Sequence, residues 1–74
     1  MWYLYICNKK GNLYTGITTD LDNRMRQHGH AELLFTEEYQ DKKDAAKRER
    51  EIKGWRREKK IGLIYNKDKP VSLP

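Results

Sequence analysis

Residues 2–7 (WYLYIC) constrain the fold most, because all six are aromatic, aliphatic or sulfur-bearing. A segment this short and this apolar is typical of a β-strand that is buried on both faces. Residues 8–11 then supply turn chemistry, with Gly11 able to adopt a positive φ. Residues 12–17 have strand-forming character again. The chain is therefore expected to begin with a β-hairpin.

Capping residues and hydrophobic spacing predict one more strand and three helices. The expected elements are a helix over residues 20–28, a strand over 32–39, a long helix from Asp41 to Lys53 and a short helix over 56–64. Thr18 or Thr19 is expected to cap the first helix, strengthened by Asp22. Gly54 is expected to end the long helix at the C′ position. The order ββαβαα predicts an α/β (α+β) fold, with a small three-stranded, mainly antiparallel sheet flanked by helices.

Length and composition exclude several classes of protein. Seventy-four residues, 36% of them hydrophobic and 36% charged, leave room for one domain and no large buried cofactor cavity. We expect this domain over residues 1–65, followed by a loosely ordered C-terminal tail over 66–74. No apolar run approaches the roughly 20 residues that a membrane span requires. The single cysteine, Cys7, excludes an internal disulfide and a zinc cluster and favours a cytoplasmic setting.

Positive charge is concentrated in one part of the chain. The net charge is +5, and residues 42–60 hold ten basic and four acidic residues, a local charge of +6. A basic stretch on an otherwise balanced domain indicates a polyanionic partner, most often nucleic acid. A solvated helix face with i,i+4 ion pairs explains the same pattern about equally well.

Glu49 lies where packing alone would not place a carboxylate. On a helical projection with Ala45 at 0°, Ile52 falls at about 340° and Glu49 at about 40°, on the apolar side of the helix. A charge there is costly unless a positive group satisfies it. Two explanations remain open, a structural ion pair, for example with Arg24, and a metal ligand or acid–base group.

Four further side chains can converge with Glu49. Arg24 and His28, at i,i+4 spacing, lie at the edge of the apolar stripe of the first helix. Tyr5 and Tyr14 share a sheet face if the hairpin register is odd-summed, for example with Tyr5 opposite Tyr14. Each has an ordinary structural explanation, as a surface arginine, a semi-buried histidine or strand-forming tyrosines. Together they suit a phosphodiester, because arginine binds phosphate oxygens, a carboxylate holds Mg²⁺ and a phenol relays a proton.

In this order, the residues resemble the GIY-YIG nuclease superfamily, and specifically its small stand-alone members. Tyr3-Leu4-Tyr5 stands where the GIY tripeptide would, and Tyr14-Thr15-Gly16 where the YIG tripeptide would. The remaining matching motifs are Thr18-Thr19-Asp20-Leu21 with Arg24 and His28, Arg48-Glu49, and Ile52-Lys53-Gly54-Trp55-Arg56-Arg57 with Lys59-Lys60. The resemblance covers residues 3–64, most of the chain.

The resemblance implies a metal-dependent DNA endonuclease. Glu49 would hold a single divalent cation, Mg²⁺ or Mn²⁺, and Arg24 would bind the scissile phosphate. Tyr14 would be the general base for the attacking water, with Tyr5 hydrogen-bonding beside it. His28 would be a second proton-handling or phosphate-contacting group. Gly16 would allow a close backbone approach near the site.

The implied partner is DNA, with branched or structured DNA as the expected substrate and a protein partner as an additional expectation. DNA repair or recombination would be the setting, and a cytoplasmic, nucleoid-associated location would follow. The residues expected to contact DNA are Arg24, Lys47, Arg48, Lys53, Arg56 and Arg57.

Three departures from the family pattern are present, and the last of them, together with the local charge of +6 over residues 42–60, supports a second hypothesis. Tyr3 replaces the first glycine, and Ile17 replaces the lysine that the repair-nuclease branch has after YIG. The Gly- and Lys-rich loop after His28 is reduced to residues 29–31. Because that loop would supply cations to the substrate, the alternative is a catalytically weak or inactive nucleic-acid-binding module with the nuclease fold.

Overall fold

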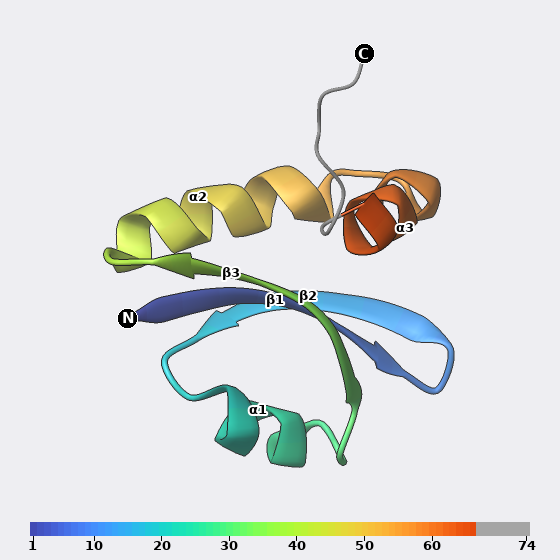
Figure 1. Cartoon of the computed structure of the whole chain (residues 1–74), viewed down its shortest axis with the longest axis horizontal. Coiled ribbons are helices and arrows are strands. Elements are labelled where there is room, and N and C mark those ends of the chain that lie inside the picture. The colour runs from blue at the N-terminus through green and yellow to red at the C-terminus, as the bar shows by residue number, and fades with distance from the viewer. Residues whose placement is uncertain (67–74) are drawn as a thin grey trace.

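A computed structural model describes residues 1–66 of the chain, and the expected order ββαβαα is confirmed (Figure 1). The elements are β1 (Trp2–Lys9), β2 (Asn12–Thr18), α1 (Leu21–Gln27), β3 (Glu32–Tyr39), α2 (Lys42–Lys53) and α3 (Arg57–Asn66). The last helix extends one residue beyond the expected domain end at residue 65. The rest of the expected tail, residues 67–74, lies outside the described residues. Among the helices of residues 1–66, none is long and apolar enough to cross a bilayer.

The sheet has the strand order β2-β1-β3, with β1 antiparallel to both neighbours. Tyr5 pairs with Gly16 on β2 and with Thr36 on β3. Tyr14 pairs with Cys7, two residues farther along β1. The odd-summed hairpin register is therefore confirmed and gives Tyr5 and Tyr14 a common sheet face. They are offset along that face rather than directly opposite.

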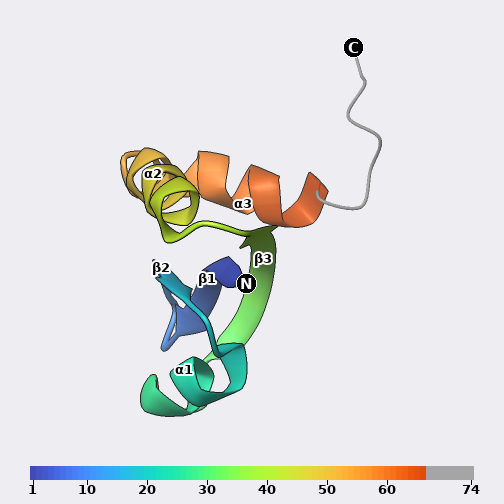
Figure 2. The same cartoon turned by 90° about the vertical axis from the view of Figure 1, so that its left-hand side faces the viewer.

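The two faces of the sheet are covered by different helices (Figures 1 and 2). Helices α2 and α3 lie over one face, where the buried core consists of Leu4, Ile6, Phe35, Ile52 and Ile64. The short helix α1 lies over the other face and contains no fully buried residue. Residues 4–7 are all buried, which confirms that the first strand is covered on both faces.

The start of α1 differs from the expectation. Asp20, not Thr18 or Thr19, is the N-cap, and its carboxylate accepts a hydrogen bond from the Asn23 amide at 3.1 Å. Thr18 is buried at the end of β2, where its hydroxyl accepts from the Asp20 amide at 3.1 Å. The threonine is therefore used to turn the chain out of the strand, which leaves the next acidic residue to cap the helix.

The end of α2 is also formed differently. Gly54 is the C-cap with φ −81° and ψ −5°, a right-handed conformation, so the expected C′ glycine with positive φ is wrong. The Gly54 amide bonds to the Glu51 carbonyl at 3.2 Å and the Trp55 amide to the Ile52 carbonyl at 2.9 Å. Such i→i−3 bonds tighten the last turn and satisfy its carbonyls without a left-handed residue.

The hairpin turn consists of Lys10 and Gly11, which join the paired residues Lys9 and Asn12. Both turn residues have positive φ, 53° for Lys10 and 86° for Gly11. A two-residue turn of this kind is the type I′ turn that fits the twist of a hairpin. Asn8 accepts a hydrogen bond from the Gly11 amide at 3.0 Å. The expected turn is confirmed, but a lysine occupies a position that favours asparagine.

Replacing that lysine should stabilise the fold. The left-handed conformation costs a lysine roughly 1 kcal/mol, whereas asparagine tolerates it. We therefore expect Lys10→Asn to raise the free energy of unfolding by about 0.5–1 kcal/mol, measured by urea denaturation at unchanged m value. The matched change Lys9→Asn, in the paired strand, should give no gain. Equal or lower stability of Lys10→Asn would contradict the turn assignment.

Candidate functional site

The position of Tyr5 depends on a glycine in the neighbouring strand. Tyr5 is only 3% exposed and pairs with Gly16 on the edge strand β2. A Cβ built on Gly16 would lie 2.5 Å from Tyr5 Oη and 2.8 Å from Tyr5 Cζ. Any side chain there would displace the ring. The Tyr5 phenol is therefore the group that closely approaches Gly16.

His28 lies between the two tyrosines of this face. Its Nε2 is 3.0 Å from Tyr5 Oη, and the two rings are edge-on with centroids 5.9 Å apart. The Tyr14 ring also lies 5.9 Å from His28, tilted by 33°. His28 is the C-cap of α1, where its amide bonds to the Arg24 carbonyl at 3.1 Å. The end of α1 thus joins the hairpin residues in one cluster.

The Tyr5 phenol keeps its proton at neutral pH. Burial is the main cause that raises the pKa of Tyr5 above its ordinary value, and the negative charge of Glu49 raises it further. The positive charge of Arg24 partly opposes this and lowers the pKa of Tyr5. A protonated phenol can donate to Nε2 of a neutral His28, which fixes the ring between the tyrosines. Tyr5 is therefore suited to positioning a neighbour rather than to accepting a proton.

Glu49 lies on α2, which covers the opposite face of the sheet from α1. Ala45 and Ile52 of α2 are fully buried, which confirms the apolar stripe, and the Glu49 side chain beside them is 20% exposed. Its charge acts on Tyr5 although α1 and α2 cover different faces. Its carboxylate is 3.1 Å from Lys53 Nζ. Within residues 1–66 its ion pair is thus with a neighbour on its own helix, not with Arg24.

The donor set fits one kind of metal site. Within the described part of the chain, no group of three or more histidine, cysteine or acidic residues is close enough to hold a metal. A zinc site made by protein ligands alone therefore does not fit residues 1–66. Mg²⁺ is commonly held by one or two carboxylates and several waters. Glu49, partly exposed and held only by a lysine, fits such a site.

Arg48, next to Glu49 in the sequence, has a structural role. Its guanidinium donates to both carboxylate oxygens of Glu37, at 3.1 and 3.3 Å, and forms an ion pair with Glu51. The hydrogen bonds that Arg48 donates to Glu37 are the main cause that raises the pKa of Arg48. The guanidinium also lies 5.3 Å from the centre of the Trp55 ring. Because its donors are engaged within the protein, we leave Arg48 out of the proposed DNA-contact set.

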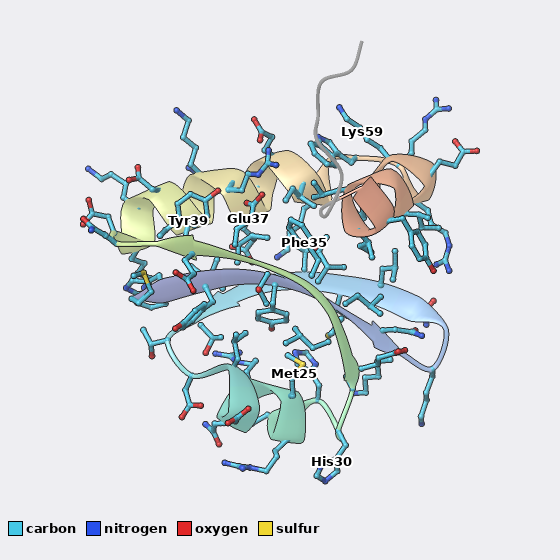
Figure 3. The ribbon with its side chains drawn as sticks, in the orientation of Figure 1. Met25, His30, Phe35, Glu37, Tyr39 and Lys59 are labelled. Atoms are coloured by element: carbon cyan, nitrogen blue, oxygen red, sulfur yellow. The ribbon has the colours of Figure 1, made fainter. Side chains whose placement is uncertain are left out.

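Glu37 and Tyr39 of β3 complete this structural network and were not singled out in the sequence. Tyr39 donates to Glu37 at 2.7 Å; burial, and then this hydrogen bond, raise the pKa of Tyr39 to about 12. Figure 3 shows both side chains directed from β3 toward α2. The strand alternation that buries Phe35 also places Glu37 on that face, which is the signal that identifies it.

The other residues expected to contact DNA have different surroundings. Arg24 is half-buried beside Tyr5, where its charge affects the phenol. The remaining expected contacts are exposed on α2 and α3 and the junction between them: Lys47, Lys53, Arg56 and Arg57. The connection between α1 and β3 consists of His28 and residues 29–31, as expected. Figure 3 shows His30 of that connection directed away from the sheet.

Comparison with known proteins agrees with this fold. The sequence model of the GIY-YIG catalytic domain matches residues 1–62. A UPF0213 protein of Staphylococcus saprophyticus is 36% identical over 75 residues, covering 84% of this chain and 92% of that protein. A UPF0213 protein of Staphylococcus aureus is 35% identical over 74 residues, covering 84% and 89%. The solution NMR structure of a UPF0213 protein from Bacillus halodurans is 33% identical with a TM-score of 0.65, covering 95% of this chain and 89% of that one.

The domain match and the structural likeness concern the same elements, from the hairpin that carries Tyr5 and Tyr14 to the helix that carries Glu49. GIY-YIG proteins are a family of nucleases that act on DNA and generally use divalent metal ions. With most of its length matched by the family and by its UPF0213 relatives, the chain belongs to the GIY-YIG nuclease family.

Proposed function

We propose that the protein is a DNA endonuclease that hydrolyses phosphodiester bonds with a single Mg²⁺ or Mn²⁺ ion. The observation that carries the proposal is the Tyr5–His28 hydrogen bond of 3.0 Å, formed where the charges of Arg24 and Glu49 both act on the phenol. Residues that are far apart in the sequence thus share one electrostatic environment. Membership of a nuclease family supports the reaction class.

Each side chain has a role that follows from its surroundings. Arg24 binds the scissile phosphate, where its planar donors stabilise the charge that develops in the transition state. Tyr14 is the general base, because it is 43% exposed and can meet an attacking water. Tyr5 keeps its proton and positions His28, which contacts the phosphate or moves a proton beside Tyr14. Glu49 holds the ion, which when bound supplies Lewis-acid stabilisation of the leaving oxygen.

Branched or structured DNA is the proposed substrate, because a domain of this size has a short footprint and depends on DNA shape rather than on extended sequence reading. Such substrates arise in repair and recombination, and a nucleoid-associated, cytoplasmic location follows. Additional specificity would come from a protein partner.

A second candidate is a nucleic-acid-binding module that no longer cuts. It is favoured by the short connection before β3, which offers His30 directed away from the sheet instead of basic side chains facing the substrate. The Lys53 ammonium against Glu49 also favours it, because a cation competes with a metal for the same carboxylate. The two candidates differ in cleavage and not in binding.

Removing the proposed metal ligand tests the first candidate. We expect Glu49→Gln to lower the cleavage of forked and plasmid DNA in Mg²⁺ or Mn²⁺ by two orders of magnitude or more, roughly the effect of losing a charge-stabilising group. DNA affinity and the unfolding transition should be retained. Glu51→Gln removes the same charge from the same helix and should leave the rate unchanged.

Two results would decide against the nuclease. Cleavage that persists in EDTA and in Glu49→Gln would show that the activity does not depend on this site. Intact DNA after long incubation with metal, together with measurable affinity, would establish the binding module instead.

The roles of the two tyrosines predict unequal effects. Tyr14→Phe should lower the single-turnover cleavage rate by about 10²- to 10⁴-fold, the range for loss of a general base. Tyr5→Phe should have a smaller effect, because a positioning group is lost. Tyr3→Phe, on the same face of β1, is the matched control and should cleave normally. A larger loss in Tyr5→Phe than in Tyr14→Phe would reverse the assignment.

Gly16→Ala tests the packing of the Tyr5 ring. The added Cβ would displace the ring and lengthen its hydrogen bond to His28. We expect cleavage to fall about 10²-fold, as for small misplacements of reacting groups, and stability to fall by about 1–3 kcal/mol. Gly54→Ala is the control, because its Cβ would lie 3.6 Å from the nearest atom, an ordinary contact. Normal cleavage by Gly16→Ala would show that ring placement does not matter.

A further inference from the structure

The hairpin turn touches the start of the last helix. Arg57, the first residue of α3, donates from Nη1 to the Gly11 carbonyl at 3.3 Å, although the two residues are 46 positions apart. Figure 1 shows the turn and α3 at the same end of the molecule, away from the N-terminus. The contact therefore brings together two segments whose charges are separate in the sequence.

Each segment contributes positive charge, so that together they form a single surface. The hairpin contributes Lys9 at the end of β1 and Lys10 in the turn, and the start of α3 contributes Arg57 together with Arg56 just before it. We refer to these four residues as the hairpin patch. Lys10, Arg56 and Arg57 are exposed, and within the described residues none of the three has a carboxylate partner.

The hairpin patch adjoins the candidate site along two routes. Lys10 lies in the turn that leads into β2, and Tyr14 is the third residue of that strand. Along α2, Lys53 is paired with Glu49 and precedes Arg56 by three residues. A DNA strand bound at Tyr14 and Glu49 would therefore continue over the hairpin patch.

The backbone at Lys10 is an independent sign of function. Lys10 has φ 53°, a conformation that disfavours lysine and favours asparagine. Lysine is less stable than asparagine in this conformation. A residue in a strained conformation points to a role for its side chain. At Lys10 that side chain is an exposed ammonium group beside two arginines.

We propose that the hairpin patch binds the backbone phosphates of the duplex arm that flanks the cleaved bond. Lysines and arginines that meet phosphates position the duplex without reading its sequence. The inference rests on the proposed function for the location of the cleaved bond. The surface replaces cations that the short connection before β3 does not supply.

Binding measured without metal tests the hairpin patch separately from cleavage. The probe is a fluorescent forked DNA with a duplex arm of twelve base pairs, titrated by anisotropy at several salt concentrations. We expect Lys10→Asn and Arg56→Gln each to weaken binding several-fold and to make the slope of log K against log salt shallower by about 0.9. Lys10→Asn is expected to be more stable than the parent, so its weaker binding cannot result from unfolding.

Two controls complete the design. Lys43→Gln removes one charge from the first turn of α2, at its other end, and should leave the slope unchanged. A probe that lacks the duplex arm should bind the parent protein and the two patch variants equally. The proposal would be overturned if Lys10→Asn and Arg56→Gln left the salt slope unchanged, or if Lys43→Gln changed it as much as they do. Either result would overturn it even if the protein cleaves DNA as proposed. Shallower slopes without any cleavage by the parent would support the patch and refute the nuclease.

Discussion

The burial of β1 on both of its faces is the constraint on which the rest of the molecule depends. Leu4 and Ile6 pack under α2 and α3, while Tyr5 and Cys7 face the side that α1 covers. A chain this small can bury little apolar surface, so its central strand has to serve both layers. The same backbone therefore holds the core and the phenol of the candidate site. A change that shifts β1 moves both, and stability and activity are hard to separate at these positions.

The electrostatic environment of Tyr5 includes residues from both sides of the sheet. Gly16 leaves room for the Tyr5 ring, and His28 of α1 lies within hydrogen-bond distance of its hydroxyl. Glu49 belongs to a helix on the other face, yet its charge acts on the same phenol. The opposite flank of α2 has a different task, because Arg48 and Glu37 bind that helix to β3. Arg48 and Glu49 are neighbours in the sequence, but they point in different directions from the helix. Arg48 therefore has a structural role, whereas Glu49 is a candidate site residue.

The sequence was sufficient where a periodic pattern determines the answer. The apolar run of β1, the turn at Gly11 and the position of Glu49 on the apolar side of its helix all follow from local spacing, and the structure has them. The cap of α1 could not be predicted, because Thr18 is used by the strand end that precedes it. The right-handed Gly54 depends on the last turn of α2, and the pairing of Arg48 with Glu37 depends on how two elements pack. The contact of Arg57 with Gly11 joins residues that are 46 positions apart, and a local sequence pattern cannot predict such a contact.

Helix α1 carries Arg24 and His28 but no fully buried residue. Its polar anchors are the Asp20 cap and the hydrogen bond from Tyr5 to His28, and its apolar side chains Leu21 and Met25 are only partly buried. An element without a fully buried side chain has a lower free energy of local unfolding than the core. Arg24 and His28 of the candidate site therefore belong to a weakly anchored helix, while Tyr5 is fixed by the core strand. A ligand that binds Arg24 must also order this helix. The affinity of the site for its ligand therefore depends on the conformational entropy that α1 loses on binding.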